Sequence, residues 1–471
     1  MKRFASQLGL IAGVAIVTAA AGISTASAAT VNVTTTVDEF GTGSRCSLRE
    51  AIWSANNDSI ADAPGCKAGS GSDTVVVPAG VFKLNKRNPD VVVPEGDPQP
   101  VGEDGNEGGD LDITNPVRII HTGINEALVT SRVSNERVFE NFGQNVVIQG
   151  LTITGGRSEI DDSDHGGGIL NRGLLTLKNS TVTDNSATYG GGVSTADTSD
   201  LTVVNSTISG NSATSDGGGI SVETGGLVHL RSASVVDNTA DSNSDGGGDG
   251  GGVFATTAGA GGVLDLKSTI VAANHDLGNE AEDCARLGGT ITSNGHNLIG
   301  NANGCDYESG PGDIINQKAK LTVLSYTGGP TDTHALKTAS PAVNKGAGCP
   351  ATDQRGVTRV KCDIGAWELS YCQGAVVNRI GTESADLIDG TDGRDGILGL
   401  GGQDTLNGLS GNDGLCGGGG PDTLNGGAGN DVLDGGAGKD NCLGNAGKTV
   451  LLKCELPKIK KPKKGHGKKH K

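Results

Sequence analysis

The sequence predicts an all-β protein in two parts, a right-handed parallel β-helix with an N-terminal helical cap followed by a parallel β-roll. Triple-glycine segments recur at intervals of 24, 27 and 33 residues, beginning at Gly166, Gly190, Gly217 and Gly250. Eight nine-residue units, each opened by glycine, run without a gap from 381 to 452. The 471 residues include 80 glycines but only 3% aromatic residues, which suits a solenoid core of stacked Val, Ile and Leu.

The first 28 residues have the pattern of a secretory signal peptide. Lys2 and Arg3 precede an apolar run from Leu8 to about Ile23, and small residues at 26–28 provide a cleavage site. The run is short for a membrane span, although an uncleaved anchor is the alternative. We therefore expect cleavage near Ala28 and a secreted or cell-surface protein without a transmembrane helix in its mature form.

The segment after the signal predicts a strand and then a single helix. Val31–Thr36 is the expected strand, and the string CSLREAI at 46–52 begins the helix. Ser47 and Glu50 match the Ser-x-x-Glu capping box, in which each side chain bonds the other residue's backbone amide. One helix face carries the apolar residues Leu48, Ala51, Ile52 and Ala55. Such a helix would cover the open end of a solenoid, where strand edges are otherwise exposed.

Further strands are predicted along the first half of the chain. They cover residues 74–77, 81–84, 111–113 and 117–120, and a proline- and acid-bearing loop is expected from about Lys86 to Gly109. In the middle, about two dozen residues per coil, with three short strands each, are typical of a right-handed parallel β-helix. Equivalent corners carry Asn185, Asn211 and Asn238. Stacked asparagines can hydrogen-bond from coil to coil, so we expect a structural role for these three.

Residues 29–369 resemble the CSLREA / choice-of-anchor Q β-helix proteins. The resemblance rests on CSLREAI, GDLDIT at 109, VVIQGLTITGG at 146, the triple glycines, TGGPTDTHAL at 327, and DQRG with CDIGAWE between 353 and 368. It implies a secreted or surface-displayed protein in which DQRG and CDIGAWE close the β-helix. Members differ in the attachment device at the C-terminus, where this chain carries the nine-residue units.

The nine-residue units follow one pattern, shown in full by GGAGNDVLD at 426–434. An apolar residue or cysteine fills the eighth place of every unit, and aspartate fills the sixth in seven of the eight units. Such a period predicts a glycine-rich turn followed by a three-residue strand, stacked into a parallel coil.

These units resemble the calcium-binding nonapeptides of RTX proteins, the hemolysin-type repeat. The resemblance implies several Ca²⁺ ions between the turns of a β-roll, held by aspartate carboxylates and by carbonyls of the glycine-rich turns. Calcium takes six or more oxygen ligands, and glycine allows the positive φ that brings carbonyls to the ion. The metal-binding residues expected on this basis are Asp386, Asp395, Asp404, Asp413, Asp422, Asp431, Asp440, Gly399, Gly408, Gly417, Gly426 and Gly435.

Stacking explains why the acidic units need a cation. A roll alternates sides at each unit, so aspartates two units apart lie one strand spacing apart, about 4.8 Å. Two carboxylates at that spacing repel by about 3 kcal/mol at an effective dielectric near 20. Residues 381–447 hold eleven acids and two bases, so we expect a loose segment that folds when calcium binds. Complete sites are expected around Asp404–Asp431 and partial ones outside. A disordered linker would not explain aspartates in strict register.

Ten cysteines, all after the signal, fit an oxidising compartment. Pairing neighbours along the chain suggests Cys46–Cys66, Cys284–Cys305, Cys349–Cys362 and Cys442–Cys454, which leaves Cys372 and Cys416. No CxxC pair occurs, so a zinc site is not expected.

Charge is unevenly distributed. The net charge is −17, but residues 457–471 contain eight lysines and no acid, which leaves the rest of the chain at −25. An acidic body does not suit nucleic acid. The lysine tail is interpreted as an attachment to anionic cell-envelope polymers, polysaccharide or lipid headgroups, with a solubilising tail as the alternative.

We therefore divide the chain into a signal peptide (1–28), a β-helix (29–369), a calcium-binding β-roll (370–456) and a disordered tail (457–471). The expected function is calcium binding outside the cell in an adhesin-like protein. A polysaccharide lyase or glycoside hydrolase is an alternative, because some β-helices degrade acidic glycans. Its candidate residues are Asp161, Asp162, Asp164, His165 and Arg172. A purely structural envelope protein is the third class.

Overall fold

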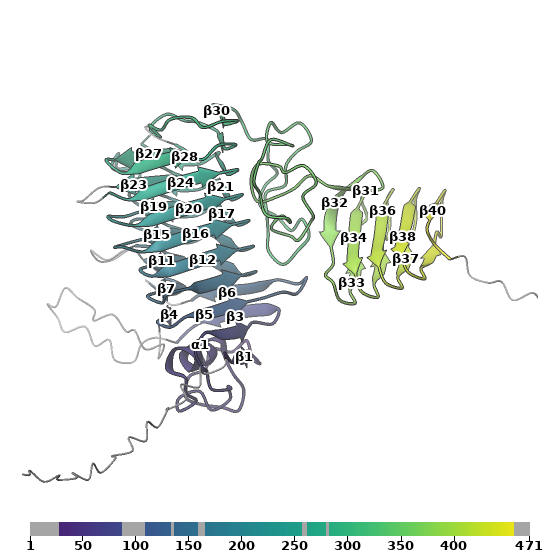
Figure 1. Cartoon of the computed structure of the whole chain (residues 1–471), viewed down its shortest axis with the longest axis horizontal. Coiled ribbons are helices and arrows are strands. Elements are labelled where there is room, and N and C mark those ends of the chain that lie inside the picture. Colours follow the sequence, from purple (N-terminus) through teal and green to yellow (C-terminus); the bar gives the residue numbers. More distant parts are fainter. Residues whose placement is uncertain are drawn as a thin grey trace, which may run out of the picture.

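The computed structural model describes residues 28–86, 109–132, 136–158, 165–256, 261–278 and 282–455. In these residues the chain forms two stacks of parallel strands, joined by a segment that is mostly loops (Figure 1). The predicted signal peptide, most of the predicted loop at 86–109 and the lysine tail lie outside the described residues. No helix of the described part is long and apolar enough to cross a membrane.

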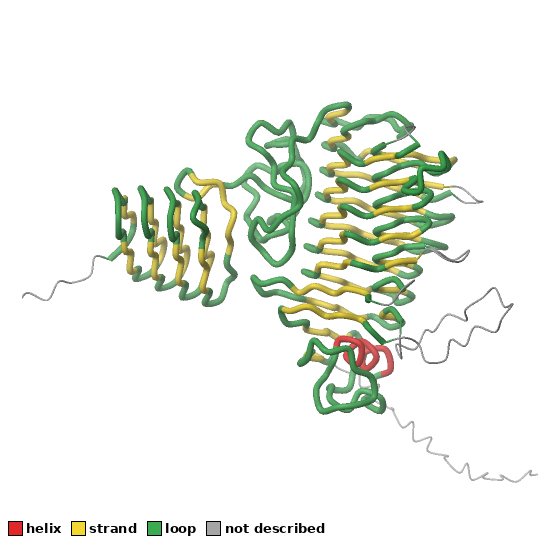
Figure 2. The backbone as a smooth tube through the Cα atoms, turned by 180° about the vertical axis from the view of Figure 1, so that it is seen from behind, coloured by secondary structure: helices red, strands yellow, loops and turns green. Residues whose placement is uncertain are grey.

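The larger stack is a right-handed parallel β-helix with four sheets, two of which contain nine strands each. Figure 2 shows these strands following one another from coil to coil. Sheet A contains, in order, β1 (Thr30–Asn32), β2 (Asp73–Val76), β5 (Val117–Ile120), β8 (Val146–Gln149), β12 (Leu174–Lys178), β16 (Asp200–Val204), β20 (Leu227–Arg231), β24 (Val263–Lys267) and β28 (Thr290–Ser293). Sheet B contains β3 (Gly80–Leu84), β6 (Ala127–Ser131), β9 (Thr152–Thr154), β13 (Thr181–Thr183), β17 (Thr207–Ser209), β21 (Ser234–Val236), β25 (Ile270–Ala272), β29 (Leu298–Ile299) and β30 (Ile314–Ile315).

The other two sheets complete each coil. Sheet C contains β4 (Leu111–Ile113), β7 (Phe139–Asn141), β11 (Ile169–Asn171), β15 (Val193–Thr195), β19 (Ile220–Val222), β23 (Val253–Thr256) and β27 (Cys284–Leu287). Sheet D contains the two-residue strands β10 (Arg157–Ser158), β14 (Ser186–Ala187), β18 (Ser212–Ala213), β22 (Thr239–Ala240) and β26 (His275–Asp276). The five coils that include sheet D have four strands each, where three are expected from the sequence, because their polar corners are themselves paired.

The pairing stacks equivalent side chains. Leu177, Val203, Leu230 and Leu266 are consecutive partners in sheet A and are all buried. One continuous core follows, which extends from Val31 to Cys305. Because alternate residues point inward, the short strands need few aromatic side chains to fill the space between the sheets.

The predicted helix is α1 (Leu48–Asn57), which lies at the first coil (Figure 1). Its capping box is formed: Ser47 accepts the Glu50 amide at 3.1 Å, and Glu50 accepts the Ser47 amide at 3.0 Å. Arg49 is buried and donates to Asp38 and to the carbonyls of Gly109 and Asp110. The helix therefore covers the end of the core, as expected, and Arg49 has a structural role. The strand predicted at 31–36 is shorter than expected, because Thr34 leaves sheet A to bond Cys46.

The asparagine ladder is confirmed and is longer than the sequence suggests. Asn185 Nδ2 donates to Asn211 Oδ1, Asn211 to Asn238, and Asn238 to Asn274, each at 2.9 Å. Asp283 ends the ladder by accepting Asn274 Nδ2 at 2.9 Å. All of these side chains are buried, so each asparagine satisfies its neighbour's amide inside the wall of the β-helix.

Residues 317–369 lie against the outer face of sheet B rather than forming another coil (Figure 1). Outward hydroxyls of this sheet bind the segment: Thr181 Oγ1 donates to the Asp332 carbonyl, and Thr207 Oγ1 to Gln354, both at 2.7 Å. A second apolar core fills the contact and includes Ile270, Ile364 and Trp367.

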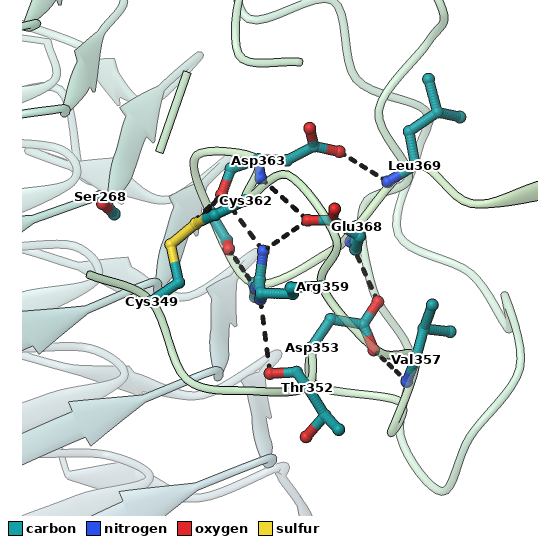
Figure 3. A network of polar contacts seen from close by, with 12 residues as sticks. Ser268, Cys349, Thr352, Asp353, Val357, Arg359, Cys362, Asp363, Glu368 and Leu369 are labelled. Atoms are coloured by element: carbon teal, nitrogen blue, oxygen red, sulfur yellow. Dashed lines mark hydrogen bonds and ion pairs between the residues drawn. A yellow bond between two sulfur atoms is a disulfide. The ribbon is translucent and has the colours of Figure 1, made fainter. Parts of the chain in front are cut away.

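The strings DQRG and CDIGAWE form one buried polar network, part of which Figure 3 shows. Asp353 accepts the amides of Val357 at 2.9 Å and Glu368 at 3.0 Å, and Arg359 pairs with Glu368 at 3.0 Å. Arg355 pairs with Asp353 at 2.8 Å and donates to the carbonyl of Val377 at 2.9 Å. Because Val377 belongs to the second stack, this network connects the two stacks.

The second stack is the roll. Its long sheet contains β31 (Tyr371–Cys372), β32 (Ala375–Ile380), β34 (Gly396–Gly401), β36 (Gly414–Gly419), β38 (Val432–Ala437) and β40 (Val450–Leu452). Its short sheet contains β33 (Leu387–Asp389), β35 (Thr405–Asn407), β37 (Thr423–Asn425) and β39 (Asn441–Leu443). Within each sheet the register advances by 18 residues, as Ile397, Leu415 and Leu433 show. The predicted alternation of sides is therefore confirmed.

The four disulfides suggested by neighbouring cysteines are present, and the remaining pair joins Cys372 to Cys416. This fifth disulfide links the β31–β32 hairpin, where the roll begins, to β36.

We expect Asn211→Ala to lower the free energy of unfolding of the β-helix by about 3 kcal/mol, because the buried backbone amide of Asn185 loses its acceptor and the buried Oδ1 of Asn238 loses a donor. Urea unfolding in the presence of chelator measures the change. Asn243→Ala is the matched control, since Asn243 is exposed and should change stability by less than about 0.5 kcal/mol. Equal changes in the free energy of unfolding for the two variants would show that the asparagine ladder does not stabilise the β-helix.

Candidate metal centre

The seven sequence-predicted aspartates form two columns, one on each side of the roll. In each column, the backbone amide of one aspartate donates to Oδ1 of the aspartate 18 residues later, at 2.9 to 3.1 Å. The first column contains Asp395, Asp413 and Asp431, and the second contains Asp386, Asp404, Asp422 and Asp440. All except the half-buried Asp386 are buried.

The second carboxylate oxygen has no such partner in most units. Among the described residues, Oδ2 is buried without a hydrogen-bond partner in Asp404, Asp413, Asp422, Asp431 and Asp440. A buried carboxylate oxygen left unpaired is costly, so five in register indicate that something absent from the chain binds them.

Each of these oxygens points toward the glycine that opens its own unit. A Cβ on Gly408 would lie 2.5 Å from Asp413 Oδ2 and 2.5 Å from the carbonyl oxygen of Gly426. The other four opening glycines, Gly399, Gly417, Gly426 and Gly435, face Oδ2 of Asp404, Asp422, Asp431 and Asp440 in the same way. Carboxylate and carbonyl oxygens thus converge on a space that only glycine leaves open.

The backbone of these five units is left-handed at two places. The second residue of the unit has a φ between 69° and 106°, and this set is Leu400, Leu409, Gly418, Gly427 and Gly436. The fourth residue has a φ between 112° and 155°, and this set is Gly402, Gly411, Gly420, Gly429 and Gly438. Glycine is required at the fourth place, because a Cβ on Gly429 would lie 1.5 Å from the carbonyl oxygen of Gly411. We call these five units, which span 399–443, the open units.

An all-oxygen set of carboxylates and carbonyls fits a hard divalent cation such as Ca²⁺. The aspartates would supply Oδ2 and the negative charge, and the turns would supply neutral carbonyl ligands. A bound ion would also cancel the repulsion along each column.

The ends of the columns are closed by residues that the nine-residue period does not reveal. Asn378 Nδ2 donates to Asp395 Oδ1 at 2.7 Å. Glu455 accepts the Asp440 amide through Oε2 and donates its own amide to the Asp440 carbonyl at 2.8 Å. Thr449 replaces aspartate in the eighth unit, and its buried hydroxyl has no partner in the described structure. Asn378 and Glu455 lie 17 residues before Asp395 and 15 after Asp440, so an 18-residue spacing misses both.

Burial and the negative charge of neighbouring carboxylates both raise the pKa of aspartates in the two columns. Burial raises the pKa of Asp404 and of Asp413 to about 6. The amide hydrogen bond to each carboxylate lowers the pKa, and the neighbouring carboxylates of the same column raise it further. The pKa of Asp422 is also raised, mainly by burial.

The described part of the chain includes two of the five alternative catalytic residues, His165 and Arg172. Asp161, Asp162 and Asp164 lie outside the described residues. His165 stacks on Tyr189 with ring centroids 5.0 Å apart and lies 3.5 Å from Glu223.

A different carboxylate group lies on sheet C. Asp110, Asp112 and Glu140 have ligand atoms within 4.8 Å of one another. Arg137 is ion-paired with Asp110 and Glu140, and Arg172 pairs with Glu140 at 2.9 Å. Arginine thus offsets charge at Asp110 and Glu140, while burial raises the pKa of Asp110 to about 7. We interpret the group as a buried polar network of the first coils.

Comparison with known proteins agrees with this geometry. Two segments, residues 380–415 and 417–451, match the family model described as RTX calcium-binding nonapeptide repeat (4 copies). No curated protein matches the chain. The chain therefore carries RTX-type calcium-binding repeats at its C-terminus, as the sequence resemblance implies.

We expect calcium binding at Asp404 and at Asp413 to weaken about tenfold per carboxylate as pH falls from 7 to 5, because calcium must then displace a proton from a group whose pKa is about 6. Between pH 3.8 and about 6, Asp404 and Asp413 are protonated in the ordered, metal-free roll but ionised in the unfolded chain. The stability of the metal-free roll therefore falls as pH rises through about 6. Calorimetry at pH 5 in buffers of different ionisation enthalpy should detect proton release on binding. An affinity independent of pH would contradict protonation of the columns.

Proposed function

We propose that this chain is a secreted calcium-binding β-helix protein whose C-terminal units become ordered on binding calcium outside the cell. The observation that carries the proposal is the series of five buried aspartate oxygens, in register, without hydrogen-bond partners among the described residues. Of the metal-binding residues expected from the sequence, we propose as calcium ligands those of the open units, which are Asp404, Asp413, Asp422, Asp431 and Asp440 with Gly399, Gly408, Gly417, Gly426 and Gly435. Asp386 and Asp395, also expected from the sequence, have a different environment and are treated separately below.

The donor chemistry favours calcium over other divalent ions. Zinc prefers nitrogen and sulfur ligands, and every cysteine of the chain is in a disulfide. Magnesium retains several waters and demands near-ideal octahedral geometry, which suits glycine-rich turns poorly. Calcium accepts a looser set of six to eight oxygens, which adjacent turns can supply together.

Secretion is supported by the chain's cysteine chemistry. Five disulfides suit an oxidising compartment, and the signal pattern at 1–28 would direct the chain there. Extracellular calcium modules bind at about 10⁻⁴ to 10⁻³ M. Sites of that affinity would be empty inside the cell and would fill after export.

We further propose that the protein is surface-associated and adhesin-like. In this division residues 29–369 form the β-helix, 370–456 the roll and 457–471 a cationic tail that contacts anionic envelope polymers or polysaccharide. The resemblance of 29–369 to CSLREA / choice-of-anchor Q proteins supports this proposal, because attachment in those proteins depends on the C-terminal part.

We expect millimolar calcium to increase the β-structure signal of the full-length protein in circular dichroism, and excess EDTA to reverse the change. Asp422→Asn should weaken calcium binding in calorimetry by about tenfold or more, because it places an amide in the turn and removes a charge. Asp389→Asn is the matched control, since it removes the same charge from an exposed position in β33. Identical spectra in calcium and EDTA, together with no heat of binding, would overturn the proposal.

We expect the full-length protein to release no reducing ends or unsaturated uronates from a panel of acidic polysaccharides, with or without calcium. In the carboxylate group of sheet C, Arg137 pairs with Asp110 and Glu140 and Arg172 pairs with Glu140, so we expect these two acids to serve an ion-pair network rather than to act as an acid and base pair. Turnover that is lost in Glu140→Gln would instead support the enzymatic alternative. Binding without turnover would support attachment.

A further inference from the structure

The roll contains two kinds of turn. In the five open units, the second and fourth residues are left-handed and Oδ2 of the aspartate lacks a hydrogen-bond partner among described residues. In the first two units, 381–389 and 390–398, no residue at these places has a positive φ. We call these two the closed units.

Threonine fills the turn of each closed unit. The amide of Thr391 donates to Asp395 Oδ2 at 2.6 Å, and its hydroxyl donates to the same oxygen at 2.9 Å. The same hydroxyl accepts the amide of Gly393 at 3.1 Å. Thr382 makes the equivalent bonds to Asp386, at 2.5 and 2.9 Å. The Oδ2 atom that lacks a hydrogen-bond partner among the described residues in the open units is therefore satisfied within the chain in the closed units.

Only the first two units have threonine at the second place. The open units carry leucine or glycine there, neither of which has a side-chain donor. Because a β-branched residue strongly disfavours a positive φ, threonine also prevents these two turns from opening.

The closed units follow directly on β32, the strand that connects the roll to the rest of the molecule. Strand β32 pairs with β34, is held by Arg355 through the Val377 carbonyl, and supplies Asn378 to Asp395. Val377 and Ile380 are buried with Val357 of the adjoining loop segment. Ile124, from the β-helix, packs against the apolar core of the roll.

We propose that Thr382 and Thr391 replace bound calcium in the first two units, so that the start of the roll is ordered without metal and templates the calcium-dependent units after it. This inference rests on the proposed calcium binding and specifies where it begins. Asp386 and Asp395 would then act as structural carboxylates, and calcium-dependent order would begin at Gly399.

The template has a physical basis in the repeat architecture. Each unit of a roll contacts only its neighbours, so order propagates along the stack once a first layer exists. The preformed layer presents the amides of Asp386 and Asp395 to the carboxylates of Asp404 and Asp413. The Cys372–Cys416 disulfide closes the intervening segment into a loop, which lowers the entropy lost when that segment orders.

Amide hydrogen exchange of the full-length protein tests the inference. In EDTA we expect peptides from 376–398 to remain protected, while peptides from 417–443 exchange at least about tenfold faster than they do in millimolar calcium. Calcium should change the exchange of 376–398 little.

The double variant Thr382→Gly/Thr391→Gly should lose protection of 376–398 in EDTA, recover it in calcium, and bind more calcium ions per chain in calorimetry. Thr382→Ser/Thr391→Ser is the matched control, since serine keeps the hydroxyl that donates to the aspartate and should therefore keep 376–398 protected in EDTA. Thr405→Ser/Thr423→Ser, in strands away from the turns, controls for general effects on the roll.

The outcomes separate the two proposals. If calcium orders 376–398 and 417–443 together, or if the glycine and serine variants behave alike, the template is wrong although calcium binding stands. If calcium changes neither exchange nor heat anywhere in the roll, the proposed function itself fails.

Discussion

Both halves of this protein depend on in-register stacking of parallel strands. Backbone hydrogen bonds place each coil on the one before it, so a side chain meets its own equivalent about one strand spacing away. The consequence depends on the chemistry of the repeated residue. Asparagine carries both a donor and an acceptor, so the column from Asn185 to Asn274 satisfies itself. Ionised aspartate only accepts, so a column of aspartates needs a donor or a cation from elsewhere.

The roll meets that need in three ways along its length. Threonine hydroxyls donate to the aspartates of the closed units, Asn378 donates to Asp395 at the start of one column, and the open units retain oxygens that fit calcium. These differences lie in single residues set on one common backbone period. Individual units of the roll therefore differ in stability and in their dependence on metal.

The periodic parts of the molecule were predictable from the sequence, and the aperiodic parts were not. Strict spacing of glycine and aspartate specifies the two columns, and the capping box specifies α1, because both patterns are local. Residues 317–369 have no period, and their position on sheet B depends on long-range bonds such as Thr181 to Asp332. The closed turns were missed because a consensus read from glycine and aspartate ignores the second residue, where Thr382 and Thr391 decide the backbone conformation. Asp283 was missed because it follows Asn274 by only nine residues, whereas the other ladder residues are separated by a full coil of the β-helix.

The 18-residue register of the roll restricts how its length can change. Strands β34, β36, β38 and β40 belong to one sheet because two units separate each from the next. Deleting or duplicating a single nine-residue unit would move every later strand to the opposite sheet, exchange the two columns, and carry Cys416 away from Cys372 if the change fell between them. Only the gain or loss of an even number of units preserves the two sheets and the two columns. The number of units can therefore change only in steps of two, both when such repeats diverge in nature and when they are engineered.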